Sequence, residues 1–423
     1  MRVFRGCQWS IVIVILLLAG ASPAFAQTAP PQALSDARAE VDRLKQELAA
    51  MRELYDKRLA DLEQKLAALS AAPAPAAAAP VPDATPAASN NAGAGASKAF
   101  NPDMSVIANF VGVAGKNDHS DQPPFQLSEV EAAFQAIVDP YARADFFLSA
   151  GPEGLEVEEG FVTFNTLPAG LLLKAGKLRA EFGKVNRAHT HALPYADRPL
   201  VTQNLVGGEE GISLPGVSLS KLIQNSVLFL EATGEAYYGN SDVFQSREKS
   251  KLTYVGRVRG YRDITEGTNL DVGGSYAIGP SAQTPQTFVM QDSSTELFGV
   301  DATFHYRPLR RAIYKRFQAR TELVWSRPRS NGITGERSFG YYGNAEYQFA
   351  RRWYAGARYD RSAQAIDATV IDKGGSFFLT YWPSEFSQVR GQYRRTNYGD
   401  GVKANEFLFQ LNFAIGAHGA HVF

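Results

Sequence analysis

Hydrophobic and polar residues alternate with a period of two from residue 100 onward, which is the pattern of β-strands that have two different faces. The last segment shows it most clearly, because Gln410 and Asn412 stand opposite an apolar set, and Phe423 falls in the phase of that set. The apolar set comprises Phe407, Phe409, Leu411, Phe413 and Ile415. Counting such segments predicts about 16 antiparallel strands over residues 100–423, an all-β region.

The same alternation would suit a soluble sandwich with its apolar face inside. Three further features favour a transmembrane barrel: strands of about ten residues, aromatic residues near strand ends, and short turns that alternate with long loops. Asp139-Pro140 and Pro383-Ser384 mark short turns, whereas residues 239–251 and 361–373 form long polar loops. An even strand number of about 16 also fits a bacterial barrel, whose lumen would be wide enough to hold water.

Residues 33–69 have a different period. Apolar residues recur at alternating spacings of three and four from Leu34 to Leu69, with one extra spacing of four between Tyr55 and Leu59. This is a heptad seam with one stutter, flanked by charged residues. A single amphipathic helix would show a wider stripe, and an interfacial membrane helix would show a strongly basic face. We therefore predict a periplasmic coiled coil over residues 33–69, followed by a Pro/Ala-rich linker over residues 70–98.

The start of the chain has the order of a cleavable secretory signal. Basic residues precede an apolar run over residues 11–19, and Ala-Phe-Ala at residues 24–26 provides a small-residue cleavage site. The apolar run is about half of the roughly 20 residues that a spanning helix needs. We predict a signal peptide over residues 1–26 and hence export. Cys7, the only cysteine, precedes the run, so the mature chain is expected to lack disulfides and thiolate metal sites.

The composition agrees with an exported barrel. The chain contains 26 Phe, 18 Tyr and 37 Gly, and no apolar stretch after the predicted signal is long enough for a spanning helix. Because lipid admits only helices and closed sheets, the strands are expected to close on themselves. Lys plus Arg equals Asp plus Glu at 43 each, so net charge does not support a nucleic-acid partner. We expect a Gram-negative-type outer membrane, with its lipid as a partner.

Charged residues of both signs occupy the inward phase of the predicted strands. The mixture favours a solvated wall with ion pairs across the lumen. The alternative is that rings of charge set ion selectivity, as in channel constrictions. The lumen charges of interest are Arg257, Arg259, Arg320, Arg358, Arg390, Arg394, Glu129 and Glu131.

Residues 177–205 form a connection that is too long and irregular for a turn, and too aromatic and basic for a disordered loop tip. Connections of this length without structure of their own are usually functional. Folded into the lumen, this loop would narrow it; the alternative is an outer loop packed on the rim. The candidate constriction and solute-binding residues are Lys177, Arg179, Lys184, Arg187 and Arg198.

His189 and His191 lie in the same loop with Asp197 nearby, and imidazole with carboxylate suits zinc. Two loop histidines are a weak motif, more often explained by hydrogen bonding within the loop. We therefore predict no metal, keep this histidine pair as a weak candidate, and expect no cofactor.

One stretch of the sequence resembles a known family. Residues 175–183, Ala-Gly-Lys-Leu-Arg-Ala-Glu-Phe-Gly, and residues 195–200, Tyr-Ala-Asp-Arg-Pro-Leu, are similar to two motifs of the phosphate-selective porin O/P family. The resemblance implies a trimeric, sixteen-stranded diffusion channel whose constriction loop lies here. It also brings in relatives with an N-terminal coiled coil, among them dicarboxylate-porin-like and siderophore-porin-like branches. Glu181 replaces the family's proline, and no ladder of pore lysines or arginines can be mapped, so phosphate specificity is not carried over.

These observations favour an outer-membrane porin for passive diffusion of small hydrophilic solutes, anionic ones included. We expect a homotrimer whose coiled coil ties the chains together or contacts the cell wall. The alternative is a siderophore or metal-complex receptor that works without TonB, or a barrel that tethers the envelope; a TonB-dependent receptor would have about 22 strands and a plug. The sequence contains no G-x-S-x-G, phosphate-loop or H-E-x-x-H motif, so we do not expect an enzyme.

Overall fold

The computed structural model describes residues 102–282, 293–311, 313–330 and 333–416, together with Gln46 and Lys57. The predicted signal peptide and linker lie outside the described residues, as do Phe423 and all of the predicted coiled coil except Gln46 and Lys57, which are both helical. The chain divides into two compact units, Met1–Asn90 and Asn91–Phe423. The described strands all belong to the second unit.

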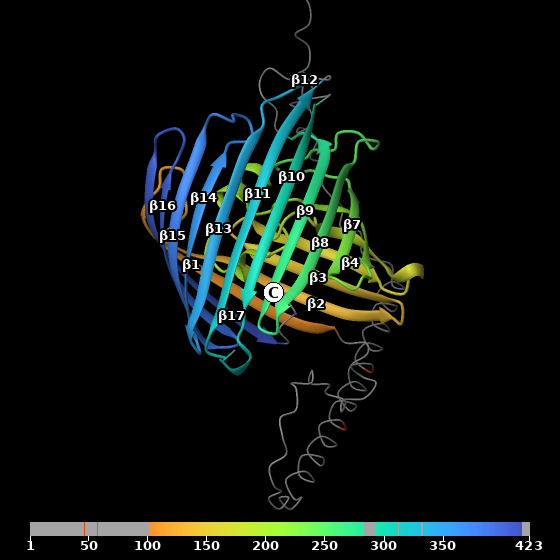
Figure 1. Cartoon of the computed structure of the whole chain (residues 1–423), viewed down its shortest axis with the longest axis horizontal. Coiled ribbons are helices and arrows are strands. Elements are labelled where there is room, and N and C mark those ends of the chain that lie inside the picture. The colour runs from red at the N-terminus through yellow and green to blue at the C-terminus, as the bar shows by residue number, and fades with distance from the viewer. Residues whose placement is uncertain are drawn as a thin grey trace, which may run out of the picture. The chain divides into compact units, whose positions relative to one another are not determined.

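One antiparallel sheet of seventeen strands makes up this second unit (Figure 1). The strands are β1 (Asp103–Lys116), β2 (Phe125–Asp139), β3 (Ala142–Gly151), β4 (Gly154–Phe164), β5 (Leu171–Arg179), β6 (Ser213–Ile223), β7 (Phe229–Tyr237), β8 (Thr253–Thr265), β9 (Thr268–Pro280), β10 (Ser293–Tyr306), β11 (Arg316–Ser330), β12 (Ile333–Thr334), β13 (Ser338–Ala350), β14 (Trp353–Ala363), β15 (Ile371–Ser384), β16 (Ser387–Asn397) and β17 (Lys403–Gly416).

The sheet closes into a barrel because β1 pairs with both β2 and β17. The two-residue β12 only extends β11, which pairs directly with β13, so the wall has 16 strands. The predicted strand number and all-β class are therefore confirmed for the barrel.

Among the described residues of the barrel unit, helical structure is limited to short segments. These are η1 (Pro168–Gly170), η2 (Thr190–Ala192), α2 (Leu200–Leu205) and η4 (Leu309–Arg311). Among the described residues, no helix is long and apolar enough to cross a bilayer.

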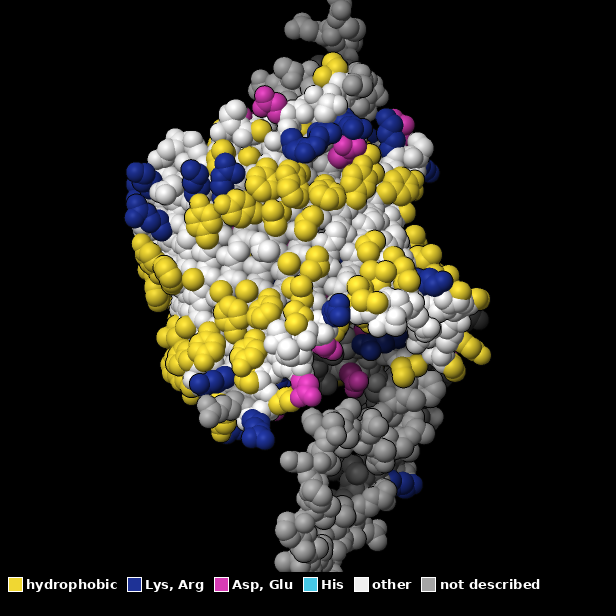
Figure 2. Space-filling model, viewed as in Figure 1, with side chains coloured by type: hydrophobic (Ala, Val, Ile, Leu, Met, Phe, Trp, Pro, Cys, Tyr) yellow, Lys and Arg dark blue, Asp and Glu magenta, His cyan; other side chains and the backbone are white. Residues whose placement is uncertain are grey.

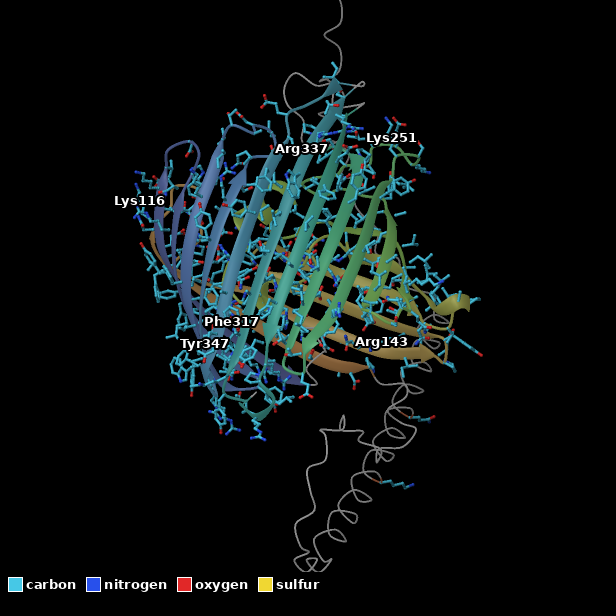
Figure 3. All side chains as sticks on the ribbon, in the orientation of Figure 1. Lys116, Arg143, Lys251, Phe317, Arg337 and Tyr347 are labelled. Atoms are coloured by element: carbon cyan, nitrogen blue, oxygen red, sulfur yellow. The ribbon has the colours of Figure 1, made fainter. Side chains whose placement is uncertain are left out.

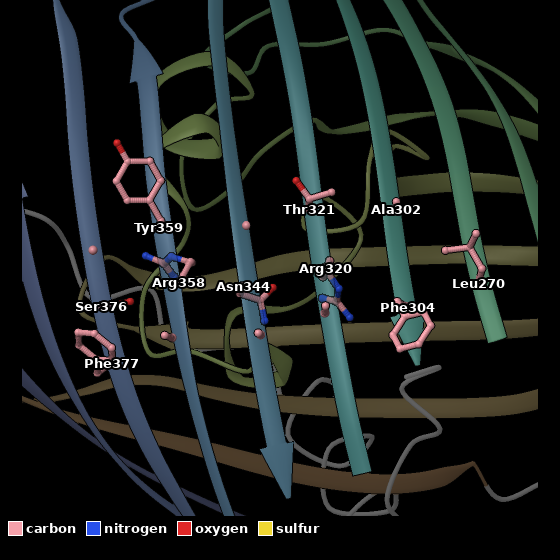
Figure 4. Close-up of a pocket in the computed structure, with 15 residues that line it drawn as sticks. Leu270, Ala302, Phe304, Arg320, Thr321, Asn344, Arg358, Tyr359, Ser376 and Phe377 are labelled. Atoms are coloured by element: carbon pink, nitrogen blue, oxygen red, sulfur yellow. The ribbon is translucent and has the colours of Figure 1, made fainter. Parts of the chain in front are cut away.

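The burial of the side chains is inverted relative to a soluble protein. On β17, Gln410 and Asn412 are buried whereas Phe407 is half exposed, and the same alternation is seen in β9, β10, β11, β13, β15 and β16. Figure 2 shows the outward aromatic and aliphatic side chains as two bands around one face of the barrel, separated by a paler band. Figure 4 shows the alternation at close range, with Phe377 and Arg358 on neighbouring strands at one recess of the wall. A soluble sandwich would bury its apolar side chains between two sheets. The apolar outer face and polar inner face of this barrel exclude that fold.

Connection lengths alternate between the two ends of the barrel. The β8–β9 and β13–β14 turns each have two residues between the strands, whereas residues 180–212 and 238–252 form long connections at the opposite end. Lys116, Lys251 and Arg337 lie toward the end with the long loops, whereas Arg143, Phe317 and Tyr347 lie toward the other end (Figure 3). This asymmetry is the one expected of a bacterial outer-membrane barrel.

The outer wall supplies a first testable prediction. Phe377 lies at the middle of β15 and is 70% exposed, between the buried Ser376 and Phe378. Placing a charge there should lower the free energy of unfolding by about 2–4 kcal/mol, because lipid cannot solvate it at this depth. We expect this loss for Phe377→Arg in urea unfolding from phospholipid vesicles and a much smaller one for Phe377→Leu. Equal losses for the two variants would contradict a lipid-facing position.

Candidate functional site

The connection between β5 and β6 is the longest described loop and contains most of the candidate functional residues. It spans residues 180–212 rather than the predicted 177–205, because β5 continues through Leu178 and Arg179, which pair with Leu214 and Ser213. Lys177 and Arg179 are therefore strand residues and not loop residues. The segments η2 and α2 both belong to this loop, which we call the β5–β6 loop.

The β5–β6 loop hydrogen-bonds to inward-facing side chains on widely separated strands. Its partners belong to β7 and β9 on one part of the wall and to β16 and β17 on another. The bonds are Glu181 N to Glu235 Oε2 (2.8 Å), Gly183 N to Ser275 Oγ (3.1 Å), Ala196 N to Gln392 Oε1 (2.9 Å) and Asn412 Nδ2 to His191 O (3.1 Å).

One side of the β5–β6 loop packs as a hydrophobic core. Its apolar residues contact an inner apolar patch of the wall, made by inward-facing residues of β8 to β15. The loop contributes Phe182, Val185, Leu193, Tyr195, Val201 and Leu205, and the patch consists of Val255, Ala277, Leu297, Val324, Tyr342 and Phe378. Sequence reasoning missed this patch, because it treated the whole inner face as wet. The patch gives the loop a large area of apolar burial, which stabilises its docking.

Asp197 binds two arginines of the wall. Its Oδ2 atom lies 2.8 Å from Arg358 Nη2 and 2.9 Å from Arg394 Nη1, and its Oδ1 atom accepts a hydrogen bond from Gln392 Nε2. The Arg358 guanidinium also lies over the Tyr195 ring, 4.3 Å from its centroid. Burial by itself raises the pKa of Asp197, but the two guanidiniums outweigh it and hold the pKa well below its ordinary value. Asp197 is therefore negatively charged at neutral pH. We call its ion pairs with Arg358 and Arg394 the Asp197 latch.

The latch meets a row of arginines that strand register creates. Arg320 on β11 faces Asn344, which faces Arg358 on β14, and Arg358 faces Ser376, which faces Arg394 on β16. We call Arg320, Arg358 and Arg394 the arginine row. The register therefore places three basic residues at one level of one part of the wall, one on every second strand.

Glu322 on β11 forms a second anchor for the loop. Its Oε1 atom accepts hydrogen bonds from the backbone N–H groups of Lys184 (3.0 Å) and Val185 (2.8 Å) and from the Tyr342 hydroxyl (3.0 Å). Three donors therefore converge on one buried carboxylate oxygen. The loop is fixed to the wall by this anchor as well as by Asp197.

Most of the predicted lumen and constriction cations are paired with carboxylates. The pairs are Lys177 with Glu156 (2.9 Å), Arg179 with Glu158 (3.2 Å), Lys184 with Asp271 (2.8 Å), Arg187 with Glu181 (2.9 Å), Arg257 with Asp301 (2.8 Å) and Arg259 with Asp271 (2.6 Å). These ion pairs agree with the expectation that the inner wall carries paired charges. They do not form rings of uncompensated charge.

Three predicted cations have no carboxylate within ion-pair distance among the described residues. Arg198 donates to the carbonyls of Val185 (3.1 Å) and Ala188 (2.8 Å), so it braces the β5–β6 loop from within. Arg390 donates to Thr380 and Gln410, and Arg320 belongs to the arginine row. Arg198 is buried, which makes it a structural residue of the loop and not a solute contact.

His189 and His191 come together with carboxylates, but not with Asp197 as the sequence suggested. His189 Nδ1 lies 2.5 Å from Glu131 Oε2 and 2.5 Å from Glu158 Oε2, and its Nε2 lies 3.1 Å from Glu159 Oε2. His191 Nδ1 lies 3.5 Å from Glu129 Oε2. Burial by itself lowers the pKa of His189, but the surrounding carboxylates raise it well above its ordinary value. Asp197 differs because its segment docks on β14 and β16, and not on β2 and β4.

Comparisons with known proteins support the fold. An uncharacterized protein of Aquifex aeolicus (strain VF5) is 28% identical, over 77% of this chain and 81% of that protein. No protein-family model matches the chain, so the resemblance to the phosphate-selective porin O/P family stays a prediction.

Several solved outer-membrane proteins are similar in structure. An anion-selective porin from Comamonas acidovorans has a TM-score of 0.53 at 11% identity, covering 74% of this chain and 99% of that one. OprB of Pseudomonas putida gives 0.52 at 8% identity (75% and 94%), and the outer-membrane channel DcaP of Acinetobacter baumannii gives 0.50 at 11% (74% and 96%). At these identities the likeness shows a porin-like barrel fold.

Proposed function

We propose that the protein is an outer-membrane porin through which small hydrophilic solutes diffuse passively. The observation that carries the proposal is the inversion of burial in a closed barrel of 16 strands, which puts polar side chains inside and apolar ones toward lipid. Such a wall lets the barrel insert into a bilayer while its lumen holds water. The predicted export signal supports an outer-membrane location.

The β5–β6 loop acts as the constriction of this channel. Its hydrogen bonds to β7, β9, β16 and β17 and its packing on the inner apolar patch support a position that reduces the open cross-section. Solutes then pass beside a loop whose polar groups are already bonded to the wall. Size, rather than a dedicated binding pocket, is therefore the first filter.

Charge selectivity of this channel is weak. The arginine row favours anions, but Asp197 and Glu406 neutralise two of its three members at close range. Most other lumen cations are likewise paired, so a passing ion meets little uncompensated charge. The solute class is thus small and hydrophilic, with anions admitted and not selected strongly.

The assembly we propose is a homotrimer in which residues 33–69 form a periplasmic coiled coil. Support comes from the heptad seam of that segment and from the resemblance to trimeric porins. The coiled coil joins the three chains or contacts the cell wall.

Planar-bilayer recording of the folded full-length protein tests the proposal. We expect stepwise conductance in potassium chloride. In a tenfold salt gradient the reversal potential should lie near zero, displaced slightly toward the equilibrium potential of chloride. Adding phosphate or a dicarboxylate should change the current little. A correctly folded protein that never raises bilayer conductance, yet takes up a siderophore or metal complex tightly and saturably, would replace the porin proposal with the receptor alternative.

A further inference from the structure

A cluster of acidic and imidazole side chains lies where the β5–β6 loop meets β2 and β4. Glu129 and Glu131 come from β2, Glu158 from β4 and His189 from the loop. Each residue offers one ligand atom, and these four atoms lie within 4.8 Å of one another. Elements far apart in the sequence therefore aim four metal-ligating side chains at one point.

The cluster has oxygen atoms with no hydrogen-bond partner among the described residues. The Oε1 atoms of Glu131 and Glu129 lack one, although Glu131 is only 1% exposed and Glu129 8%. Buried carboxylate oxygens without partners are strongly unfavourable, because burial removes the water that would solvate them. A bound cation would satisfy them.

Arg179 and Glu159 hold Glu158 and His189 in orientations that suit metal binding. Arg179 Nη2 binds Glu158 Oε1 at 3.2 Å, which leaves Oε2 turned toward His189. Glu159 binds His189 Nε2 at 3.1 Å and is itself fixed by the Arg179 backbone N–H at 2.8 Å. A carboxylate that accepts from one ring nitrogen of a histidine presents the lone pair of the other nitrogen to a metal.

The geometry at His189 Nδ1 calls for a cation. This nitrogen lies 2.5 Å from one oxygen of Glu131 and 2.5 Å from one oxygen of Glu158. A single ring proton can point at only one of these two oxygens, whereas a metal ion can bind all three atoms. The four carboxylates Glu129, Glu131, Glu158 and Glu159 meet at most three positive charges, those of Arg179, His189 and His191, so negative charge is in excess.

We propose that Glu129, Glu131, Glu158 and His189 bind one divalent first-row transition-metal ion, with Glu159 as a positioning residue. An imidazole ligand among carboxylates suits zinc, manganese or iron, whereas calcium and magnesium prefer oxygen ligands alone. The ion would tie the β5–β6 loop to β2 and β4, whereas Asp197 ties it to β14 and β16. This inference does not depend on the porin proposal, because metal binding is measured without a bilayer.

The test uses the folded full-length protein in detergent, stripped with a chelator and titrated with Zn²⁺ by calorimetry. We expect one zinc ion per chain, and weaker binding in Glu131→Gln and His189→Gln by at least the 10–100-fold typical of losing an outer-shell partner. Glu159→Gln should fall within that 10–100-fold range and still bind. Glu346→Gln, an inward-facing carboxylate on β13 outside the cluster, is the matched control and should bind as the wild type does.

Folding and metal class are checked separately. Heat-modifiable migration on gels establishes that each variant is folded, and Co²⁺ added to the stripped protein should give visible absorption bands that Glu131→Gln loses. Wild-type protein that binds no more Zn²⁺ than folded Glu131→Gln would overturn the proposal and leave a proton-bridged ion-pair cluster only. Tighter binding of Ca²⁺ than of Zn²⁺ would overturn the assignment to a transition metal.

Discussion

Asp197→Ala should release the β5–β6 loop from the arginine row. The substitution removes the carboxylate that Arg358 and Arg394 share, and breaking a buried ion pair by removing one partner destabilises by roughly 3–5 kcal/mol. We expect about 3 kcal/mol, the lower end of that range, because Arg358 keeps Asp360 at 2.7 Å and Arg394 keeps Glu406 at 2.6 Å. The loss falls on loop docking rather than on the sheet, since Asp197 pairs with no strand backbone.

Hydrogen exchange of the loop amides measures this release. A docking loss of about 3 kcal/mol corresponds to exchange on the order of 100-fold faster around residues 193–206, while the strand amides keep their protection. Asp197→Asn is the control, because its amide oxygen can still accept from one partner, so its exchange should lie between those of the wild type and Asp197→Ala. Unchanged exchange in Asp197→Ala would show that the latch does not hold the loop.

Glu322→Ala should have an effect of similar size at the other anchor. The change leaves the N–H groups of Lys184 and Val185 and the Tyr342 hydroxyl buried without their acceptor. Each orphaned donor costs about 1–3 kcal/mol, so we expect a loss of about 3 kcal/mol or more in loop docking. Exchange at residues 184–186 and a lower temperature of loop release should report it.

Glu322→Gln is the matched variant for this anchor. All three donors bind a single oxygen, Oε1, and glutamine retains a carbonyl oxygen at that place. Glutamine should therefore keep most of the docking energy that alanine loses. The same loss in both variants would mean that the charge of Glu322, and not its role as an acceptor, fixes the loop.

The barrel wall was predictable from the sequence because its pattern is local. The alternation of Phe407, Phe409 and Phe413 with Gln410 and Asn412 determines which face of a strand meets lipid, without any knowledge of its neighbours. Strand number and starts follow from the same alternation and from turn residues. The main error lies in the bounds of the β5–β6 loop, predicted as 177–205 and observed as 180–212, because the period of two is lost where the irregular loop joins its two strands.

The site depends on register, which the sequence does not display. Arg320, Arg358 and Arg394 form a row only because Asn344 and Ser376 on intervening strands align them. The period of two indicated that all three point inward, but not that they lie at one level. The pairing of Asp197 with Arg358 and Arg394 likewise depends on tertiary structure, which the sequence pattern does not display.

The acidic cluster shows the same limit. Residues 129 and 131 were predicted to face the lumen and His189 was singled out in the loop, yet nothing in the sequence joins them. Their meeting requires the β5–β6 loop to cross to β2 and β4. The nearby Asp197 was the natural guess for a partner, and it was wrong because sequence proximity in an irregular loop does not predict which wall a residue reaches.

Two single-cysteine variants on β11 test directly whether ions pass through the lumen of the barrel. Gln318 is in the phase of the buried Glu322 and Val324, which points inward, and its neighbour Ala319 is in the outward phase. Cys7 in the predicted signal is the only native cysteine. A charged, membrane-impermeant methanethiosulfonate should lower the single-channel conductance of Gln318→Cys and leave that of Ala319→Cys unchanged. Unaltered current in Gln318→Cys despite complete labelling, or equal block in both variants, would contradict a conduction path through the barrel.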